Sequence, residues 1–230
     1  VCIIGIFIAI IISIFLSSKI TEPITKITKK AKKLGSGDTE VTFEESGIKE
    51  IDELSEALTQ AQMEMVKTDL KVMQMNPFEK IGSQWMLVTA EKDGKVNTMT
   101  ASWGGVGVLW GKDVATVYIR PQRYTKEFVD AADTFTLTFF DGECKKEMGY
   151  LGKVSGRDEA DKIEKAGLHV QHVDGYPTFE EASQVLVCKK LYQDTIKPEN
   201  FYGNEEDEKW YPQKDYHTMY IAEIVAVYTK

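Results

Sequence analysis

The sequence contains little cysteine: Cys2, Cys144 and Cys188 are the only three, and they lie far apart in a chain of 230 residues. The absence of a CxxC pair and of an even set of cysteines argues against a disulfide-stapled secreted fold and favours a reducing compartment. Because Cys144 and Cys188 are lone residues in a helical and a strand pattern, we expect both to be inert.

Histidine is equally scarce, and the sequence predicts no metal site. His169 and His172 lie three positions apart without further ligand residues nearby, so we interpret them as surface residues. No HExxH, CxxC or clustered-carboxylate signature occurs.

An excess of positive charge is also missing. The net charge of −8 and the pI near 5.1 argue against nucleic-acid binding. The charge is nevertheless uneven, because lysines crowd the segment that follows the first apolar run. They are Lys19, Lys26, Lys29, Lys30, Lys32 and Lys33.

Residues 1–16, VCIIGIFIAIIISIFL, carry no charge. A complete span needs about 20 apolar residues, and a truncated start would explain the shortfall. A signal peptide is disfavoured, because no basic region precedes the run and no Ala-x-Ala-like site follows it. We expect a transmembrane helix whose following lysines lie on the cytoplasmic side. A buried core helix is the alternative.

Two heptad-spaced seams follow the apolar run and predict a helical linker at residues 17–69. The first comprises Ile20, Ile24, Ile27, Ala31 and Leu34, and ends at the glycine-rich residues 35–38. The second comprises Ile48, Ile51, Leu54 or Ser55, Leu58, Ala61 and Met65.

This helix–connector–helix pattern resembles a HAMP domain. The matching residues are Pro23 and Ile24, Gly37 and Asp38, and the run Glu50, Ile51, Asp52, Glu53 and Leu54. Thr39 departs from the family, which commonly has a larger apolar residue there. The resemblance implies a parallel homodimer that passes small helix motions to an output domain. A solvated helical hairpin is the alternative.

From about residue 70 the apolar period changes to 2, and we expect a mainly β domain at residues 71–230. Strands are expected at 85–90, 96–103, 114–120, 134–140, 183–193 and 219–228, with helical stretches at 125–132, 144–151 and 158–166. Asp93 and Gly94 carry a hairpin signal. About six antiparallel strands with inserted helices suggest a small barrel. We interpret residues 104–107 as a loop, because their glycines lack the context of a dinucleotide fingerprint.

Several segments of this domain resemble the flavin reductase family of FMN-binding split β-barrels, in particular its flavoredoxin-like members. They are residues 76–77, 97–103, 120–125, 155–158 with Lys162, 208–212 and 215–220. One departure is Leu151, where relatives often carry cysteine, so a redox-active thiol is unavailable at that position.

The resemblance implies a site for FMN. Its phosphate needs cationic and hydroxyl donors, which the two strand-to-helix turns at 120–125 and 155–162 carry. The cofactor-binding residues implied are Asn97, Thr98, Met99, Thr100, Ala101, Ser102, Trp103, Arg120, Pro121, Arg123, Tyr124, Thr125, Ser155, Gly156, Arg157, Lys162 and His217. By period 2 the side chains of 97–103 alternate between two faces, and we favour the backbone with Asn97 and Thr100 for ring contacts. His217 is equally well a structural histidine. No catalytic residue is identified.

The favoured function is an oxidoreductase in which NAD(P)H passes hydride to FMN and on to free flavin, ferric iron or a protein. The alternative is a membrane-anchored redox sensor or signal transducer coupled through the HAMP-like module. Both families are dimeric, so we expect a homodimer. The expected location is a bacterial-type inner membrane with the flavin domain in the cytoplasm. If the N-terminal fusion is an artefact of gene assembly, the protein is cytoplasmic.

Overall fold

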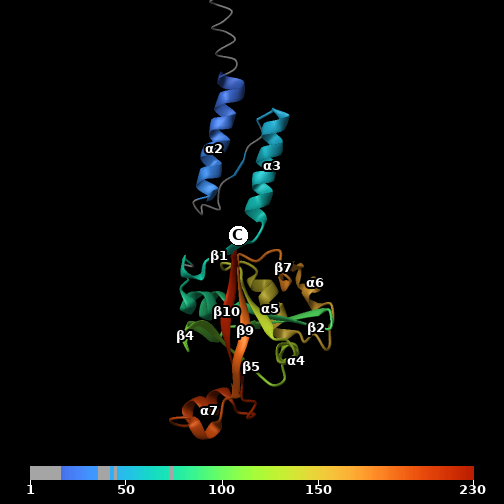
Figure 1. Ribbon diagram of the computed structural model, residues 1–230. Helices are drawn as coiled ribbons and strands as arrows, with labels where there is room; N and C mark the ends of the chain where they lie inside the picture. Colours follow the sequence, from blue (N-terminus) through green and yellow to red (C-terminus); the bar gives the residue numbers. More distant parts are fainter. Residues whose placement is uncertain (1–16, 36–41, 44–45, 73–74) are drawn as a thin grey trace, which may run out of the picture. The chain divides into compact units, whose positions relative to one another are not determined.

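The computed structural model describes residues 17–35, 42–43, 46–72 and 75–230 (Figure 1). The chain divides into two compact units, residues 1–64 with Lys230, and residues 65–229, which are treated separately. The membrane helix expected at residues 1–16 lies outside the described residues. Among the helices that are described, none is long and apolar enough to cross a membrane.

The first unit contains the π-helical turn η1 (Ser17–Thr21) and the helices α2 (Glu22–Gly35) and α3 (Lys49–Met63). The expected seams are partly buried, with Ile27 and Ile51 each 8% exposed. The sequence left Leu54 and Ser55 as alternatives for one position of the second seam. The structure places Ser55 there, because Ser55 is buried whereas Leu54 is half exposed. Helix α3 ends at Met63, so Met65 does not extend its seam.

Asp52 organises the start of α3. Its Oδ1 accepts hydrogen bonds from the backbone N of Ser46 at 2.6 Å and from Ser46 Oγ at 2.8 Å. Its Oδ2 accepts one from the backbone N of Gly47 at 3.1 Å. These bonds lower the pKa of Asp52 and satisfy amides that precede the helix. The acidic first turn that the sequence shows therefore has a local structural role.

The second unit is an antiparallel sheet with helices attached. Its main strands are β1 (Val66–Thr68), β2 (Met86–Lys92), β3 (Lys95–Ala101), β4 (Gly104–Leu109), β5 (Lys112–Ile119), β6 (Thr134–Phe139), β9 (Gln184–Thr195) and β10 (Thr218–Thr229). A separate hairpin comprises β7 (Val170–Val173) and β8 (Tyr176–Phe179). The helices are α4 (Tyr124–Ala131), α5 (Lys145–Lys153), α6 (Lys162–Ala166) and α7 (Glu205–Trp210), with short turns η2 (Leu70–Val72), η3 (Phe78–Gln84) and η4 (Pro198–Asn200).

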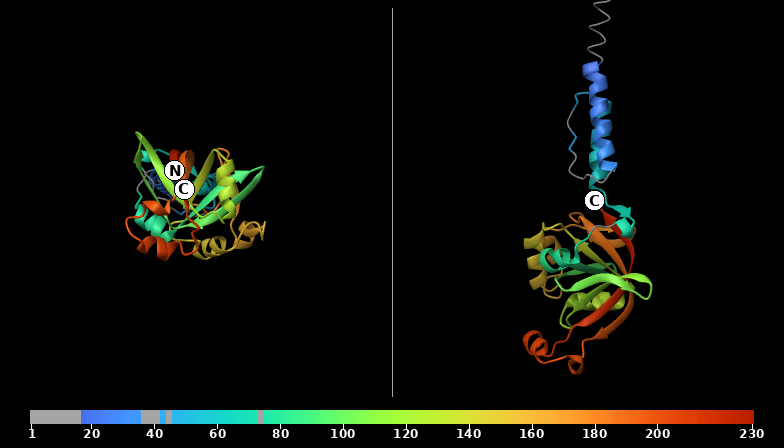
Figure 2. Two further views of the ribbon diagram at one scale, coloured as in Figure 1. Left: turned by 90° about the horizontal axis from the view of Figure 1, so that it is seen from below. Right: turned by 90° about the vertical axis from the view of Figure 1, so that its left-hand side faces the viewer.

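The strands follow the order β3-β2-β6-β9-β10-β5-β4, with β1 beside β10. The expectation of a barrel is corrected here, because the described strands do not close: β3 and β4 are the two edges and do not pair with each other. The long strands β9 and β10 run side by side, and the views of Figure 2 show how strongly the sheet is twisted and curved. Core residues such as Leu137 and Tyr220 on one face, and Leu87 and Phe179 on the other, bury the sheet on both sides.

Two further expectations are corrected. Residues 104–107 are not a loop but the start of β4, which pairs with β5 and turns back through Trp110 and Gly111, both at positive φ. Residues 66–68, which the sequence pattern placed in the helical linker, form β1 and pair with β10. Strand β1 obtains its hydrogen bonds from a partner distant in sequence, whereas β4 obtains them from β5, the next strand in the chain. The hairpin expected at Asp93 and Gly94 is present, again with positive φ at both residues.

Two glycines of β4 differ in how closely they approach the backbone of the neighbouring strand β5. A Cβ at Gly104 would lie 2.6 Å from the backbone oxygen of Thr116, whereas a Cβ at Gly107 would meet nothing within 4 Å. We expect Gly104→Ala to lower the free energy of unfolding by about 1 to 3 kcal/mol and Gly107→Ala to change it by less than about 0.5 kcal/mol. Denaturant unfolding followed by tryptophan fluorescence measures both, and equal effects would contradict the close approach of β4 to β5.

Candidate functional site

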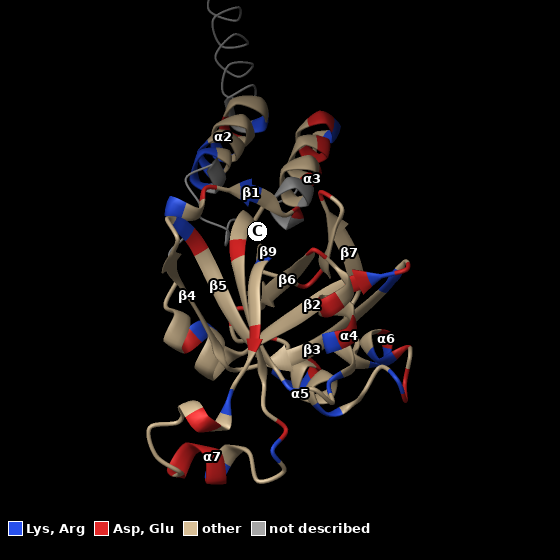
Figure 3. Cartoon of the chain, turned by 60° about the horizontal axis from the view of Figure 1, so that its bottom comes forward, with Lys and Arg blue, Asp and Glu red and all other residues tan. Residues whose placement is uncertain are grey.

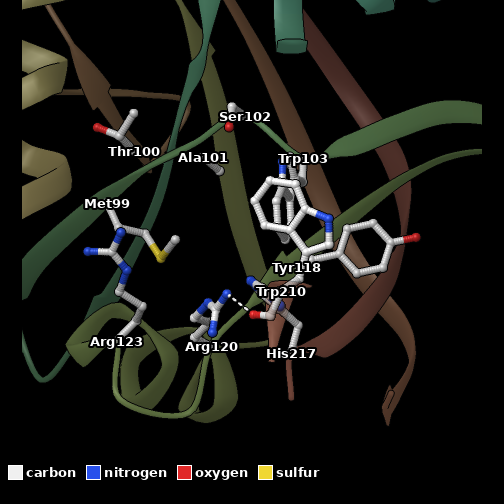
Figure 4. Close-up of a pocket in the computed structure, with 10 residues that line it drawn as sticks. All are labelled: Met99, Thr100, Ala101, Ser102, Trp103, Tyr118, Arg120, Arg123, Trp210 and His217. Atoms are coloured by element: carbon white, nitrogen blue, oxygen red, sulfur yellow. Dashed lines mark hydrogen bonds between the residues drawn. The ribbon is translucent and has the colours of Figure 1, made fainter. Parts of the chain in front are cut away.

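Two adjoining hollows open where the chain crosses from β3 to β4. The first, here called the aromatic hollow, has a volume of about 250 Å³. It is lined by Met99, Thr100, Ala101, Ser102, Trp103, Tyr118, Arg120, Arg123, Trp210 and His217 (Figure 4). The second, the basic hollow, has a volume of about 330 Å³. It is lined by Met99, Arg120, Gln122, Arg123, Tyr124, Thr125, Lys153, Val154, Ser155 and Lys162. Because three residues line both hollows, the two form one continuous cleft.

Rings from three segments line one side of the aromatic hollow. Trp103 follows β3, Trp210 ends α7 and His217 precedes β10; Figure 4 shows them gathered opposite Met99. The rings of Trp103 and Trp210 have centroids 5.0 Å apart and planes at 88°, an edge-to-face pair. The ring of His217 lies 5.1 Å from that of Trp103.

His217 is an uncharged member of this group near neutral pH. It is 6% exposed, and its Nδ1 lies 2.9 Å from the hydroxyl of Tyr211. Burial, assisted by the positive charge of Arg120, lowers the pKa of His217 to about 4. The imidazole therefore contributes shape and hydrogen bonding to the hollow without a charge.

Arg120 fixes the segment that carries Trp210. It lies directly after β5, forms an ion pair with Asp215, and donates a hydrogen bond from Nη2 to the carbonyl of Trp210 at 2.9 Å. Gln122 donates a second hydrogen bond to Asp215, at 2.8 Å. Hydrogen bonds from Gln122 and Arg120 lower the pKa of Asp215, so this carboxylate compensates the charge of Arg120.

The basic hollow contains two cations, of which Arg123 is half-buried and Lys162 is buried. Arg123, the residue before α4, donates from Nη1 to the carbonyl of Gly152 at 2.5 Å. Lys162, at 3% exposure, donates from Nζ to the carbonyls of Thr98 at 2.6 Å and Val154 at 3.1 Å. Within the part of the chain that the structure describes, no carboxylate pairs with either one.

The electrostatic cost of this arrangement appears in the pKa values. Burial lowers the pKa of Arg123, and the neighbouring Arg120 lowers it further. Burial lowers the pKa of Lys162 to about 8, with Arg123 as the second cause. Two desolvated, mutually repelling cations favour an anionic ligand between them, because an anion would restore the solvation that both have lost.

Of the other residues predicted for the site, some line the hollows and others make their contacts elsewhere. Asn97 donates to Thr125 Oγ1 at 2.8 Å, so these two buried side chains satisfy each other. Thr98 points away and bonds Thr89, and Thr100 donates to the carbonyl of Met148 at 2.5 Å. Arg157 forms an ion pair with Glu127 instead of lining either hollow.

Gly156 packs closely against two residues near the site. A Cβ at this position would collide with the side chain of Asn97 and crowd the ring of Tyr124. Ser155 lines the basic hollow, and Pro121 is exposed at the turn before α4.

Five lining residues were missed by reasoning from sequence: Tyr118, Gln122, Lys153, Val154 and Trp210. Four of them lie next to predicted residues, so a wider window around Arg120 and Ser155 would have included them. Trp210 lies within a segment that carries the family resemblance, but nothing in its spacing shows that α7 returns to β3.

Comparison with known families gives two matches. Residues 78–230 match the family described as flavin reductase-like domain, and residues 15–67 match the HAMP domain. No curated protein is significantly similar in sequence to the chain.

Solved structures share the fold. An FMN-binding domain of a flavin reductases-like enzyme from Shewanella baltica is 20% identical, with a TM-score of 0.52, covering 72% of this chain and 77% of that one. The flavoredoxin of Desulfovibrio vulgaris (Miyazaki F) is 23% identical, with a TM-score of 0.49 and the same coverage. A flavoredoxin from Methanosarcina acetivorans is 21% identical, with a TM-score of 0.48, covering 69% and 75%.

Burial of neutral His217 predicts a specific pH dependence of stability. Its pKa is 6.5 in the unfolded chain and about 4 when folded, so between these values the unfolded state binds more protons. The stability that this residue contributes is therefore present above pH 6.5 and is lost as the pH falls towards 4. We expect His217→Gln to remove this part of the slope. Because all four tryptophans lie in the second unit, unfolding followed by their fluorescence measures it. An unchanged slope in the variant would contradict the assignment.

Proposed function

The chain belongs to the flavin reductase-like domain family, and from this membership we propose that it binds FMN and acts as an oxidoreductase of the flavin reductase type. In this proposal NAD(P)H supplies hydride to the flavin, which passes electrons to an acceptor. The observation that supports it most directly is a pair of cations, half-buried Arg123 and buried Lys162, without a carboxylate partner among the described residues.

The donor set of the basic hollow fits the phosphate of FMN. A dianionic phosphate binds well to guanidinium forks, ammonium groups and hydroxyls, which Arg123, Lys162, Lys153 and Ser155 would provide. Arg123 gives no side-chain cap to α4, so amides of its first turn remain available as further donors. Above pH 8, loss of the Lys162 proton would weaken this half of the site, although a bound phosphate would raise that pKa.

The edge position of β3 fits the flavin ring. Strand β3 pairs only with β2, so half of its backbone N–H and C=O groups point outward without a ladder partner. The stretch Thr100 to Trp103 runs along the aromatic hollow and could offer these groups to the polar edge of the ring. Bound flavin would supply the hydride chemistry, while the protein positions the ring and excludes water. No side chain is assigned as a catalytic acid.

The phosphate assignment predicts a difference between two ligands. We expect Arg123→Gln to weaken FMN binding by about 10- to 100-fold and riboflavin binding by less than about threefold, because riboflavin lacks the phosphate. Arg157→Gln is the matched control, since Arg157 pairs with Glu127 outside both hollows. Isothermal titration of both ligands measures the effects. A loss of FMN affinity in the control equal to that in the variant would refute the assignment.

The redox assignment predicts a spectral change. Purified protein should bind FMN with a visible flavin spectrum that bleaches when NADH or NADPH is added without oxygen. Comparing the two nucleotides would identify the reductant. A folded protein that fails to bind added FMN would contradict the proposal, and bound flavin that neither nucleotide reduces would favour the second function below.

A second candidate function is a flavin redox sensor or signal transducer coupled through the HAMP domain. The observation that favours it is β1, which begins three residues after α3 ends. Strand β1 pairs with the last three residues of β10, and the hydroxyls of Thr68 and Thr229 lie 2.8 Å apart. The other end of β10 follows His217 in the aromatic hollow. One buried strand thus joins the candidate flavin site to the chain segment that leads to the helices.

Hydrogen exchange tests this second function. If β10 transmits the state of the site, reduction of bound FMN by dithionite should change the protection of the amides of 66–68 by about threefold or more. Each tenfold change would correspond to about 1.4 kcal/mol. Thr68→Val should reduce this response, because it removes the hydroxyl pair with Thr229. Identical protection in both redox states would exclude coupling through β1.

Assembly and location follow from the same premises. We propose a homodimer, since the HAMP match implies paired helices, and a membrane anchor formed by residues 1–16 with the flavin domain on the cytoplasmic side. The electron acceptor would be free flavin, ferric iron, a protein or the class of molecule argued below.

A further inference from the structure

The aromatic hollow has a wall of two partly exposed tryptophans. Trp103 is 38% exposed and Trp210 is 39% exposed, although they already form an edge-to-face pair. Tryptophan is highly buried on average in folded proteins. A paired aromatic surface left open inside a cavity therefore favours a flat apolar ligand, which would gain both burial and ring contacts.

The charges around this wall are compensated. Arg120 is paired with Asp215, and His217 is neutral because burial lowers its pKa. Of the cations without a carboxylate partner among the described residues, Lys162 lines only the basic hollow. Arg123 lines both hollows, but on the side of Met99, across from the two tryptophans in Figure 4.

Helix α7 adds negative charge beside Trp210. Its first turn carries Glu205, Glu206, Asp207 and Glu208, and Figure 3 shows these acidic residues together on the helix. Lys209 lies over the Trp210 ring, with Nζ 4.9 Å from its centroid. Asp207 is paired with Lys214, and the other three carboxylates of this turn disfavour a phosphorylated ligand near α7.

We infer that the Trp103–Trp210 wall binds an uncharged planar quinone beside FMN, and that a quinone is the electron acceptor. The inference rests on the proposed function for its reaction. The net step is NAD(P)H plus a proton plus quinone giving NAD(P)⁺ plus quinol. Two electrons and one proton come from the nicotinamide as hydride through the flavin, and the second proton comes from water.

Trp210 can be tested against a tryptophan outside the cleft. Trp110, at the β4–β5 turn, is 63% exposed and lines neither hollow. The probe is duroquinone, an uncharged quinone whose substituted ring resists addition of thiols, titrated calorimetrically into the full chain with and without saturating FMN. We expect Trp210→Leu to weaken duroquinone binding by about tenfold or more and Trp110→Leu by less than about twofold. Trp210→Phe, which keeps a flat ring, should retain most of the duroquinone affinity, and Trp110→Leu should leave FMN affinity within about twofold of that of the unchanged protein.

The outcomes separate this inference from the proposed function. Absence of duroquinone binding, equal effects of the two leucine variants, or displacement of duroquinone by FMN would each overturn the quinone site. Binding that depends on Trp210 in a protein that does not bind FMN would support the wall and refute the flavin function. Binding beside FMN that depends on Trp210 would support both.

Discussion

The open seam between β3 and β4 is the constraint on which the site depends. The chain crosses from one sheet edge to the other through Ser102 and Trp103, yet these edges do not pair with each other within the described strands. A closed sheet would consume the outward backbone groups of β3 in a ladder. Because the seam is open, the start of α4, the turn after α5 and the α7 segment can all approach β3. Both hollows form where they meet.

Electrostatics divides the resulting cleft into two functional halves. Arg120 is balanced by Asp215, whereas half-buried Arg123 and buried Lys162 bond only to backbone carbonyls among the described groups. The cost of desolvating these two cations is visible in their lowered pKa values. A ligand that is anionic at one end and flat at the other matches this division, as FMN does. The proposal that FMN is the ligand accords with this division and with the family match.

The connection between the two units bears on whether the protein turns over substrate or reports redox state. A HAMP domain ahead of a flavin reductase-like domain joins a signalling module to a redox module in one chain. Strand β1 makes the junction part of the sheet, because it covers the edge of β10 beyond the reach of β5. The segment after α3 is therefore held by hydrogen bonds to a core strand rather than by a free linker.

Much of the architecture could be read from local patterns, because alternation and helix periodicity depend on near neighbours in sequence. The strands around Leu87, Leu137 and Leu186, the turn at Asp93 and Gly94, and the helix after Arg123 were all predictable. Arg123 and Lys162 could also be named as candidate cofactor-binding residues, through the family resemblance.

Other features were decided only by contacts between distant segments. Period 2 shows that Thr98 and Met99 face opposite ways but not which one meets the cleft. The three residues of β1 become a strand only because β10, far along the chain, offers hydrogen bonds. Arg157 pairs with Glu127 and does not line either hollow, and Arg120 holds the carbonyl of Trp210 beside Trp103. The sequence alone determined which segments are strands or helices and which residue types could bind an anion. Tertiary structure decided which of them meet, because pairing, burial and charge compensation act across space rather than along the chain.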